Sequence, residues 1–137
     1  MNMENNEEQE LIFKLSVFEQ QIQQLQQQLQ AIEQGIVEMS SLNTGLDELI
    51  GSQNKEILAP IGRGIFAKAK LISEELTVDI GGRNFVKKTI PATKKIIEKQ
   101  IKKLEEVKEN LNDNLERVSG ELQTVMNKEG EKEEKNK

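Results

Sequence analysis

Apolar residues in the first part of the chain recur in alternating steps of four and three positions, and this spacing restricts the possible folds more than any other feature of the sequence. A strict seven-residue repeat keeps one narrow apolar stripe, the seam, turned toward a partner helix, whereas a helix in a globular domain has a broader and less regular apolar face. The repeat continues for more than about five heptads, so we predict a coiled-coil helix over residues 11–51. Its seam positions are Leu11, Leu15, Phe18, Ile22, Leu25, Leu29, Ile32, Ile36, Met39, Asn43, Leu46 and Ile50.

A second seam with the same spacing predicts a coiled-coil helix over residues 90–126. Thr89 and Pro91 favour a helix start at this point, because proline is suited to the first helical turn. Lys108 takes one seam position and Val107 lies beside it. Two seams of similar length favour antiparallel pairing within the chain, so the residues between them must reverse the chain direction. The apolar seam positions are Ile97, Ile101, Leu104, Leu111, Leu115, Val118, Leu122 and Val125.

The segment between the two seams contains two pairs of short apolar stretches, and each pair is separated by a glycine turn. The stretches 57–61 and 65–71 flank the sequence GRG, and the stretches 76–80 and 85–89 flank the sequence GGRN. This pattern predicts two β-hairpins over residues 56–89. Isolated hairpins are marginally stable in water, so we expect these strands to pair with strands of other chains and to drive assembly. The candidate assembly residues are Ile57, Ile61, Ile65, Phe66, Val78, Ile80 and Phe85.

The predicted fold class is therefore α+β, a long antiparallel coiled-coil hairpin joined by two short β-hairpins. Only 35% of the 137 residues are hydrophobic and 3% are aromatic, which is few for a large globular core. Residues 1–10 and 127–137 contain few or no apolar residues, and we expect both segments to be disordered. We find neither a secretory signal nor an apolar run of the roughly 18 residues that a membrane span needs. These features predict a cytoplasmic protein without a membrane partner.

The sequence contains neither cysteine nor histidine, which removes disulfides, Cys/His metal sites and the usual general base near neutral pH. Gly62 and Gly64 around Arg63 could form a phosphate-binding loop, but the strand-to-helix context of such loops is missing, so a hairpin turn is favoured. Asp47 and Glu48 are neighbours on a helix, so their carboxylates point apart and cannot converge on one substrate. We therefore predict that the protein is not an enzyme and needs no cofactor or metal.

Seven lysines gather around the predicted start of the second helix, which could favour an acidic partner or a nucleic acid. No aromatic residue lies among them to stack on bases, and the net charge of the chain is −5. A solvated helix face paired with Glu98, Glu105 and Glu106 is the preferred interpretation, and no nucleic-acid partner is expected. The lysines are Lys87, Lys88, Lys94, Lys95, Lys99, Lys102 and Lys103.

Apolar residues outside the seams are absent from residues 19–30, where every position off the seam is Glu or Gln. Val37, Leu42 and Leu49 are close to the hairpins in sequence, so we expect the strands to cover them. Other off-seam apolar residues lie toward the opposite ends of the two helices, where no strand can cover them. They form either additional packing in a frayed helix end or a binding surface for partners. The candidate binding residues are the off-seam Ile12, Phe13, Val17 and Met126, together with the seam residues Leu122 and Val125, which fraying of the helix ends would expose.

The segment EILAPIGRGIFAKAKLISEELTVDIGGRNFVKKT, residues 56–89, resembles the assembly region of prefoldin subunits. The shared features are an apolar strand, a turn of proline, an apolar residue and Gly-x-Gly, a strand with Phe-x-x-Ala, the strand VDIG, and a Phe-Val strand that leads into the second helix. With the two flanking seams, the resemblance extends over nearly the whole chain. Two hairpins between the helices are typical of the α-type subunit, whereas the β-type has one.

The resemblance implies a hexamer of two α-type and four β-type subunits whose hairpins form intersubunit β-barrels. It also implies an ATP-independent chaperone that captures unfolded proteins at its coiled-coil tips and delivers them to a group II chaperonin. The implied partners are β-type prefoldin subunits, unfolded client proteins and that chaperonin. A coiled-coil spacer or a filament-forming homo-oligomer on the same barrel is the alternative, because it needs the hairpins but not the apolar helix ends.

Overall fold

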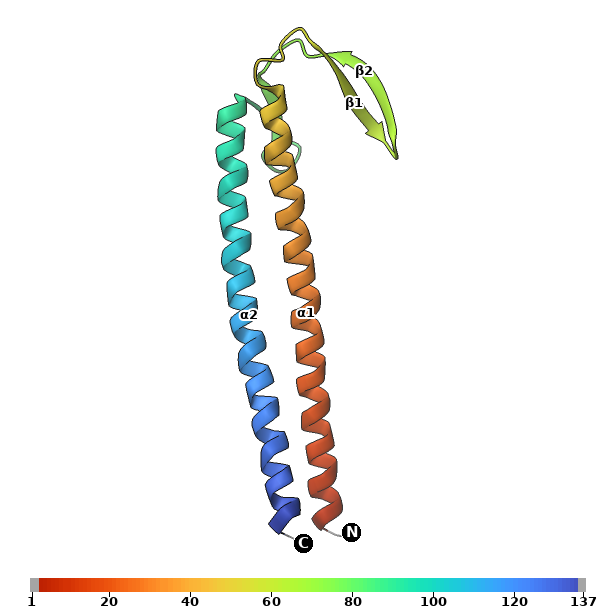
Figure 1. The fold of residues 1–137 in the computed structure, drawn as a ribbon, viewed down its shortest axis with the longest axis vertical. Helices are drawn as coiled ribbons and strands as arrows, with labels where there is room; N and C mark the ends of the chain where they lie inside the picture. Colours follow the sequence, from red (N-terminus) through yellow and green to blue (C-terminus); the bar gives the residue numbers. More distant parts are fainter. Residues whose placement is uncertain (1–2, 136–137) are drawn as a thin grey trace. The chain divides into compact units, whose positions relative to one another are not determined.

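The computed structural model describes residues 3–135, which form two long helices separated by two β-hairpins (Figure 1). The elements in chain order are α1 (Met3–Leu49), β1 (Glu56–Gly62), β2 (Ile65–Lys70), β3 (Leu76–Asp79), β4 (Phe85–Lys88) and α2 (Ile90–Lys135). The described residues divide into two units. Unit 1 contains the residues up to Gly35 and from Leu104 onward, and unit 2 contains Ile36–Lys103.

In unit 1 the two helices pack along the predicted seams, where Leu29 of α1 and Val118 of α2 are buried. Val118 lines a groove together with Leu25. Lys108, the polar residue of the second seam, places its Nζ atom 3.7 Å from Oε1 of Glu33. Residues later in α2 thus meet residues earlier in α1, so the helices are antiparallel and the predicted α+β coiled-coil hairpin is confirmed.

The core of unit 2 lies where the two helices meet the second hairpin. Leu46, Ile90 and Ile97 are buried together. Because Leu76 belongs to β3, its contact with this core fixes the second hairpin against the helices. The partly buried residues that pack on the core are Met39, Leu49, Leu76 and Ile101.

Local backbone chemistry sets the inner ends of both helices. Thr89 is the N-cap of α2, because its Oγ1 accepts a hydrogen bond of 3.2 Å from the backbone N–H of Ala92. The α1 helix ends at Leu49, and Gly51 follows with a φ of 74°, a conformation that glycine adopts without steric cost. Ile50 is consequently exposed and Leu49 packs on the core, so the predicted seam position at Ile50 is wrong.

The outer parts of both helices differ from the prediction of disordered ends. Residues 3–10 belong to α1 and residues 127–135 belong to α2, so disorder is wrong for these residues, and residues 1–2 and 136–137 lie outside the described chain. Glu, Gln and Lys, which are frequent in these segments, have favourable helix propensity. Once the seam has nucleated a helix, extending the helix by such residues costs little free energy. A polar composition alone therefore does not end the helix.

The two hairpins form separate two-stranded antiparallel sheets. Strands β1 and β2 pair from Glu56 opposite Lys70 to Gly62 opposite Ile65, with an irregularity between Pro60 and Gly62. Strands β3 and β4 pair from Leu76 opposite Lys88 to Asp79 opposite Phe85. The predicted tandem hairpins are therefore present, with boundaries within about two residues of those expected.

In each hairpin the two central residues of the turn have positive φ. In the first hairpin Arg63 has a φ of 49° and Gly64 a φ of 80°. In the second, Gly82 has a φ of 59° and Arg83 a φ of 62°, and the N–H of Asn84 donates to the carbonyl of Gly81. Positive φ at both central residues is the signature of a type I′ turn, whose twist matches that of the flanking strands. The interpretation of Gly62 to Gly64 as a hairpin turn is confirmed.

Candidate functional site

The seven candidate assembly residues are called the hairpin cluster below. Six of them lie on the strands and Ile80 directly follows β3, and other parts of the chain leave most of them uncovered. Ile61, Ile65, Phe66, Ile80 and Phe85 are exposed, and Ile61 reaches 70% exposure. Ile57 and Val78 are half-buried. Large apolar side chains exposed together on two short hairpins are unfavourable in water and mark an interaction surface.

Apolar residues occupy both faces of the first hairpin. Ile57 lies opposite Ala69 and shares a face with Ala59, while Pro60 lies opposite Phe66 on the other face. A two-stranded sheet has no second layer of its own to bury either face. The register therefore favours burial of this hairpin between elements of other chains.

The second hairpin has one covered face and one uncovered face. Val78 lies opposite Val86, on the same face as Leu76, and all three are half-buried. Leu76 packs on the core of unit 2. Phe85 and Asp79 face one another on the other side, where both are exposed. Phe85 is thus available to a second chain.

Two exposed residues of this region were missed by the sequence analysis. Leu58 in β1 is exposed, and Ile72, in the connection between the hairpins, is the most exposed large apolar residue of the described chain, at 80%. Leu58 could have been found, because apolar residues at both odd and even positions of a strand indicate that both faces are buried in the assembly. No periodic signal marks Ile72.

The second candidate surface is the end cluster, which consists of the six candidate binding residues of unit 1. Ile12, Phe13 and Met126 are exposed, and Phe13 reaches 70% exposure. The remaining three are half-buried, which fits a partial role in packing between the helices. The half-buried residues are Val17, Leu122 and Val125.

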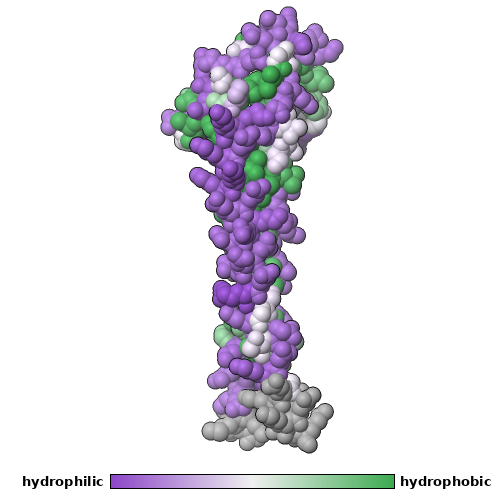
Figure 2. All heavy atoms as spheres, turned by 60° about the vertical axis from the view of Figure 1, so that its left-hand side comes forward, coloured by the Kyte–Doolittle hydropathy of each residue, from purple (hydrophilic) through white to green (hydrophobic). Residues whose placement is uncertain are grey.

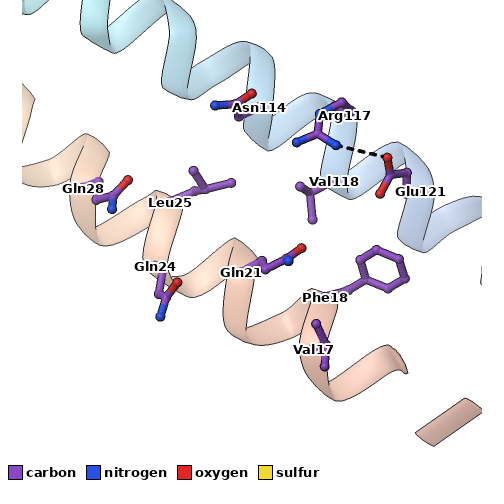
Figure 3. A pocket seen from close by; sticks show the side chains of 10 residues that line it. All are labelled: Val17, Phe18, Gln21, Gln24, Leu25, Gln28, Asn114, Arg117, Val118 and Glu121. Atoms are coloured by element: carbon purple, nitrogen blue, oxygen red, sulfur yellow. Dashed lines mark hydrogen bonds and ion pairs between the residues drawn. The ribbon is translucent and has the colours of Figure 1, made fainter. Parts of the chain in front are cut away.

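A shallow groove of about 340 Å³ joins this region to the seam of unit 1 (Figure 3). Phe18, Leu25 and Val118 point toward the space between the helices. Arg117 and Glu121 form an ion pair of 3.3 Å at its edge. The glutamines from α1 make most of the remaining lining polar, so the groove has no enclosed cavity for a small molecule.

The strands do not cover all of the apolar residues that were expected to lie beneath them. Val37 and Leu42 are exposed, so that expectation is wrong for both, whereas Leu49 is packed against the core of unit 2. Figure 2 shows separate hydrophobic patches interrupting the largely hydrophilic surface of one face. Val37 and Leu42 are close to the first hairpin in sequence, but no side chain of that hairpin buries them.

The lysines around the start of α2 are not neutralised as expected. Among the described residues the ion pairs are Lys94 with Asp47, Lys108 with Glu33, and Arg117 with Glu121. The predicted pairing of these lysines with Glu98, Glu105 and Glu106 is therefore wrong. Unit 2 has twelve Lys and Arg and eight Asp and Glu, a formal charge of +4, whereas unit 1 has seven and sixteen, a formal charge of −9.

No group of side chains suited to hold a metal ion occurs in the described part of the chain. Among the same residues no helix has the length and apolar character needed to cross a membrane.

Comparisons with known proteins agree with this geometry. The family model for a prefoldin subunit matches residues 18–135. The chain is 32% identical over 111 residues to the prefoldin subunit alpha of Methanobrevibacter smithii, covering 80% of this chain and 76% of the relative. It is 29% identical to the prefoldin subunit alpha of Methanococcus maripaludis, covering 83% and 78%. Its fold is similar to a chain of filamentous PFD from Methanocaldococcus jannaschii, with a TM-score of 0.74, 18% identity and coverage of 84% and 97%.

Proposed function

The chain belongs to the prefoldin family, and on this premise we propose that it is the α-type subunit of an ATP-independent chaperone that captures unfolded proteins. The hairpin cluster then joins this chain to β-type partners through an intersubunit β-barrel, and the end cluster binds the client. The protein acts in the cytoplasm as a binding subunit, without catalysis or a cofactor, and the client passes to a group II chaperonin.

The exposure of two separate apolar clusters is the observation that carries this proposal. A subunit that only assembles needs the hairpin cluster, but it gains nothing from leaving Phe13 and Met126 uncovered. Each such side chain contributes about 1.5–3 kcal/mol when a partner buries it fully. Several subunits that offer one weak end cluster each to the same unfolded chain would bind it with high avidity and without a deep pocket.

We expect the triple variant Phe13→Ser, Val17→Ser and Met126→Ser to bind unfolded clients about tenfold more weakly or worse, because about 1.4 kcal/mol of lost apolar contact gives that factor. The measurement is light scattering of a denatured protein diluted into the assembled complex. Native mass spectrometry and circular dichroism should show unchanged complex size and helicity.

A matched control removes three apolar residues outside the end cluster, through Val37→Ser, Leu42→Ser and Val107→Ser. These residues are also exposed, so the loss of apolar surface is comparable. The control complex should suppress aggregation as well as the parent does. If the control fails while the end-cluster variant protects, the client surface lies on the exposed residues Val37, Leu42 and Val107 instead.

A structural role as a spacer or filament subunit is the second candidate, and the likeness to a filamentous chain of the same fold is the observation that favours it. A spacer built on the hairpin cluster would leave the aggregation of a denatured protein unchanged. The aggregation assay of the parent complex therefore separates the two functions.

A further inference from the structure

The exposed apolar side chains of the end cluster on α1 share a helix face with glutamates. Glu8 precedes Ile12 by four positions, and residues at this spacing are neighbours on a helix. Glu10 precedes Phe13 by three positions, and the two line the same shallow depression on α1. Glu7, Glu8 and Glu10 are all exposed and are called the acid group below. The acid group therefore lies beside the apolar surface proposed to bind the client.

Nearby residues of the chain do not balance the negative charge of the acid group. Within the described residues none of its three members makes an ion pair. Lys14 is the only basic residue of α1, and its spacing allows it to pair with Glu10 but not with Glu7 or Glu8. Residues 127–137 at the end of α2 contain four lysines and four glutamates, so they add no net charge. The end of unit 1 thus keeps an excess of negative charge, in agreement with the formal charge of −9 of the whole unit.

The needs of the helix itself do not account for the position of the acid group. Because α1 begins at Met3, the three acids lie beyond its first turn, where the interaction of a carboxylate with the helix dipole has mostly ended. Residues 20–32 of the same helix contain no charged residue, and glutamine makes their exposed face polar. Neutral side chains therefore suffice to solvate α1 away from the end cluster, and the acids are concentrated where apolar side chains are exposed.

Given the proposed function, on which this inference rests, we propose that the acid group makes the end cluster selective for unfolded segments in which lysine or arginine is interspersed among apolar residues. The apolar stem of a client lysine packs on Ile12 or Phe13 while its ammonium group reaches a carboxylate of the acid group. The ring of Phe13, which is 70% exposed, also attracts a cation over its face. A client segment with glutamates at the same positions meets like charges and binds more weakly.

This selectivity is small at each contact and depends on ionic strength. A single exposed ion pair contributes little, so a measurable preference requires several such contacts together. The screening length falls from about 30 Å in 0.01 M salt to about 8 Å at physiological ionic strength, which weakens these contacts. A complex with more than one copy of this chain adds the preferences of its end clusters when they bind the same client.

The test measures binding of three unfolded peptides to the assembled complex by fluorescence anisotropy, at low salt, about 0.02 M, and at high salt, about 0.5 M. The peptides share the same leucines and phenylalanines and carry lysine, glutamine or glutamate at the positions between them. At low salt we expect the lysine peptide to bind about tenfold more tightly than the glutamate peptide, with the glutamine peptide between them. At high salt the difference should fall to about twofold or less.

Neutralising the acid group through E7Q, E8Q and E10Q should reduce the low-salt preference to about threefold or less and leave the affinity for the glutamine peptide unchanged. Glutamine and glutamate have similar helix propensities, so circular dichroism should show unchanged helicity. The matched control, E105Q, E106Q and E109Q, removes the same charge from exposed positions of unit 1 outside the end cluster and should keep the preference of the parent. All complexes are assembled with the same preparation of partner subunits.

Three results would overturn the proposed selectivity. The parent complex could bind the lysine and glutamate peptides equally, or the acid-group variant and the control could lose the preference to the same extent, which would assign it to net charge. Self-association of the acid-group variant with an unchanged peptide preference would assign these acids to solubility instead. If none of the three peptides binds the parent complex, the proposed function fails together with the selectivity.

Discussion

Glycine has two opposite roles in this chain. Gly120 lies inside α2, where a Cβ atom would have no neighbouring atom within 4 Å and where glycine only adds flexibility to the unfolded chain. Gly64 lies in the first type I′ turn with a φ of 80°, where other residues are strained although the surrounding space is equally open. The backbone conformation, rather than the surrounding space, therefore determines how a side chain at each position changes the free energy of unfolding.

The same substitution should consequently have opposite effects at these two positions. Gly120→Ala is expected to raise the free energy of unfolding by about 0.5–1 kcal/mol, because alanine is the better helix former. Gly64→Ala should destabilise its turn by about 1–2 kcal/mol and weaken assembly. Urea unfolding followed by circular dichroism measures the first effect, and titration with the partner subunit measures the second. Equal effects of the same sign would contradict this account.

The coiled coil contains a polar residue at a place where apolar packing is expected. Asn43 takes a seam position of α1, and its Oδ1 atom is buried without a hydrogen-bond partner in the described chain. A buried acceptor without a partner costs about 1–3 kcal/mol. Asparagine in a seam commonly lowers stability while it fixes the register of the two helices.

Asn43→Leu is therefore expected to raise the free energy of unfolding by about 1–3 kcal/mol and to loosen the register. Because the chain has no cysteine, the register can be measured by disulfide formation between residues introduced as Asp47→Cys and Lys94→Cys, which replace a native ion pair. In the Asn43→Leu background, a smaller share of the disulfide cross-links should join these two positions than in the parent. Thr44→Leu on the exposed surface is the control and should stabilise by no more than about 0.5 kcal/mol, the gain in helix propensity. An unchanged or lower stability of Asn43→Leu would disprove the cost assigned to Asn43.

At the level of elements, the sequence predicts the helices and the hairpins, because apolar periodicity determines the helices and turn residues determine the hairpins. The seam spacing identified both helices and placed Lys108 in the seam, and the glycine turns identified both hairpins. Periodicity does not report where a helix stops, so the exposure of Ile50 and the helical ends of the chain were not foreseen. It also does not tell which apolar residues the folded chain leaves exposed, which is why Leu58, Val37 and Leu42 were missed or misplaced.

At the scale of the whole molecule, this chain presents more apolar strand surface than it can bury by itself. Phe66 and Phe85 are exposed on different hairpins. We expect native mass spectrometry to find two copies of this chain with four β-type partners, and Phe66→Asp with Phe85→Asp to abolish the complex, because a carboxylate cannot be buried in a barrel without a countercharge.

The control for this prediction is Phe13→Asp, which should leave the stoichiometry unchanged because Phe13 lies in the end cluster. A complex of normal size from the double variant would contradict assembly through the hairpins. Long polymers of this chain without a partner would favour the spacer function instead.

The narrow seam of unit 1 also determines how the helices open. Each layer of side chains along the seam touches only the layers before and after it, so the cohesion of the pair is a nearly one-dimensional sum, like that of a zipper. Opening of such a structure starts at its free ends and advances layer by layer, with a free energy that rises with distance from the end. Phe13 and Met126 lie next to the outermost apolar seam positions, Leu11 and Val125, so we expect their layers to open before those of the buried Leu29 and Val118. If an unfolded chain binds unit 1 as proposed, its binding favours the opening of further layers. The apolar area that unit 1 exposes would then increase on binding and decrease when the helices close.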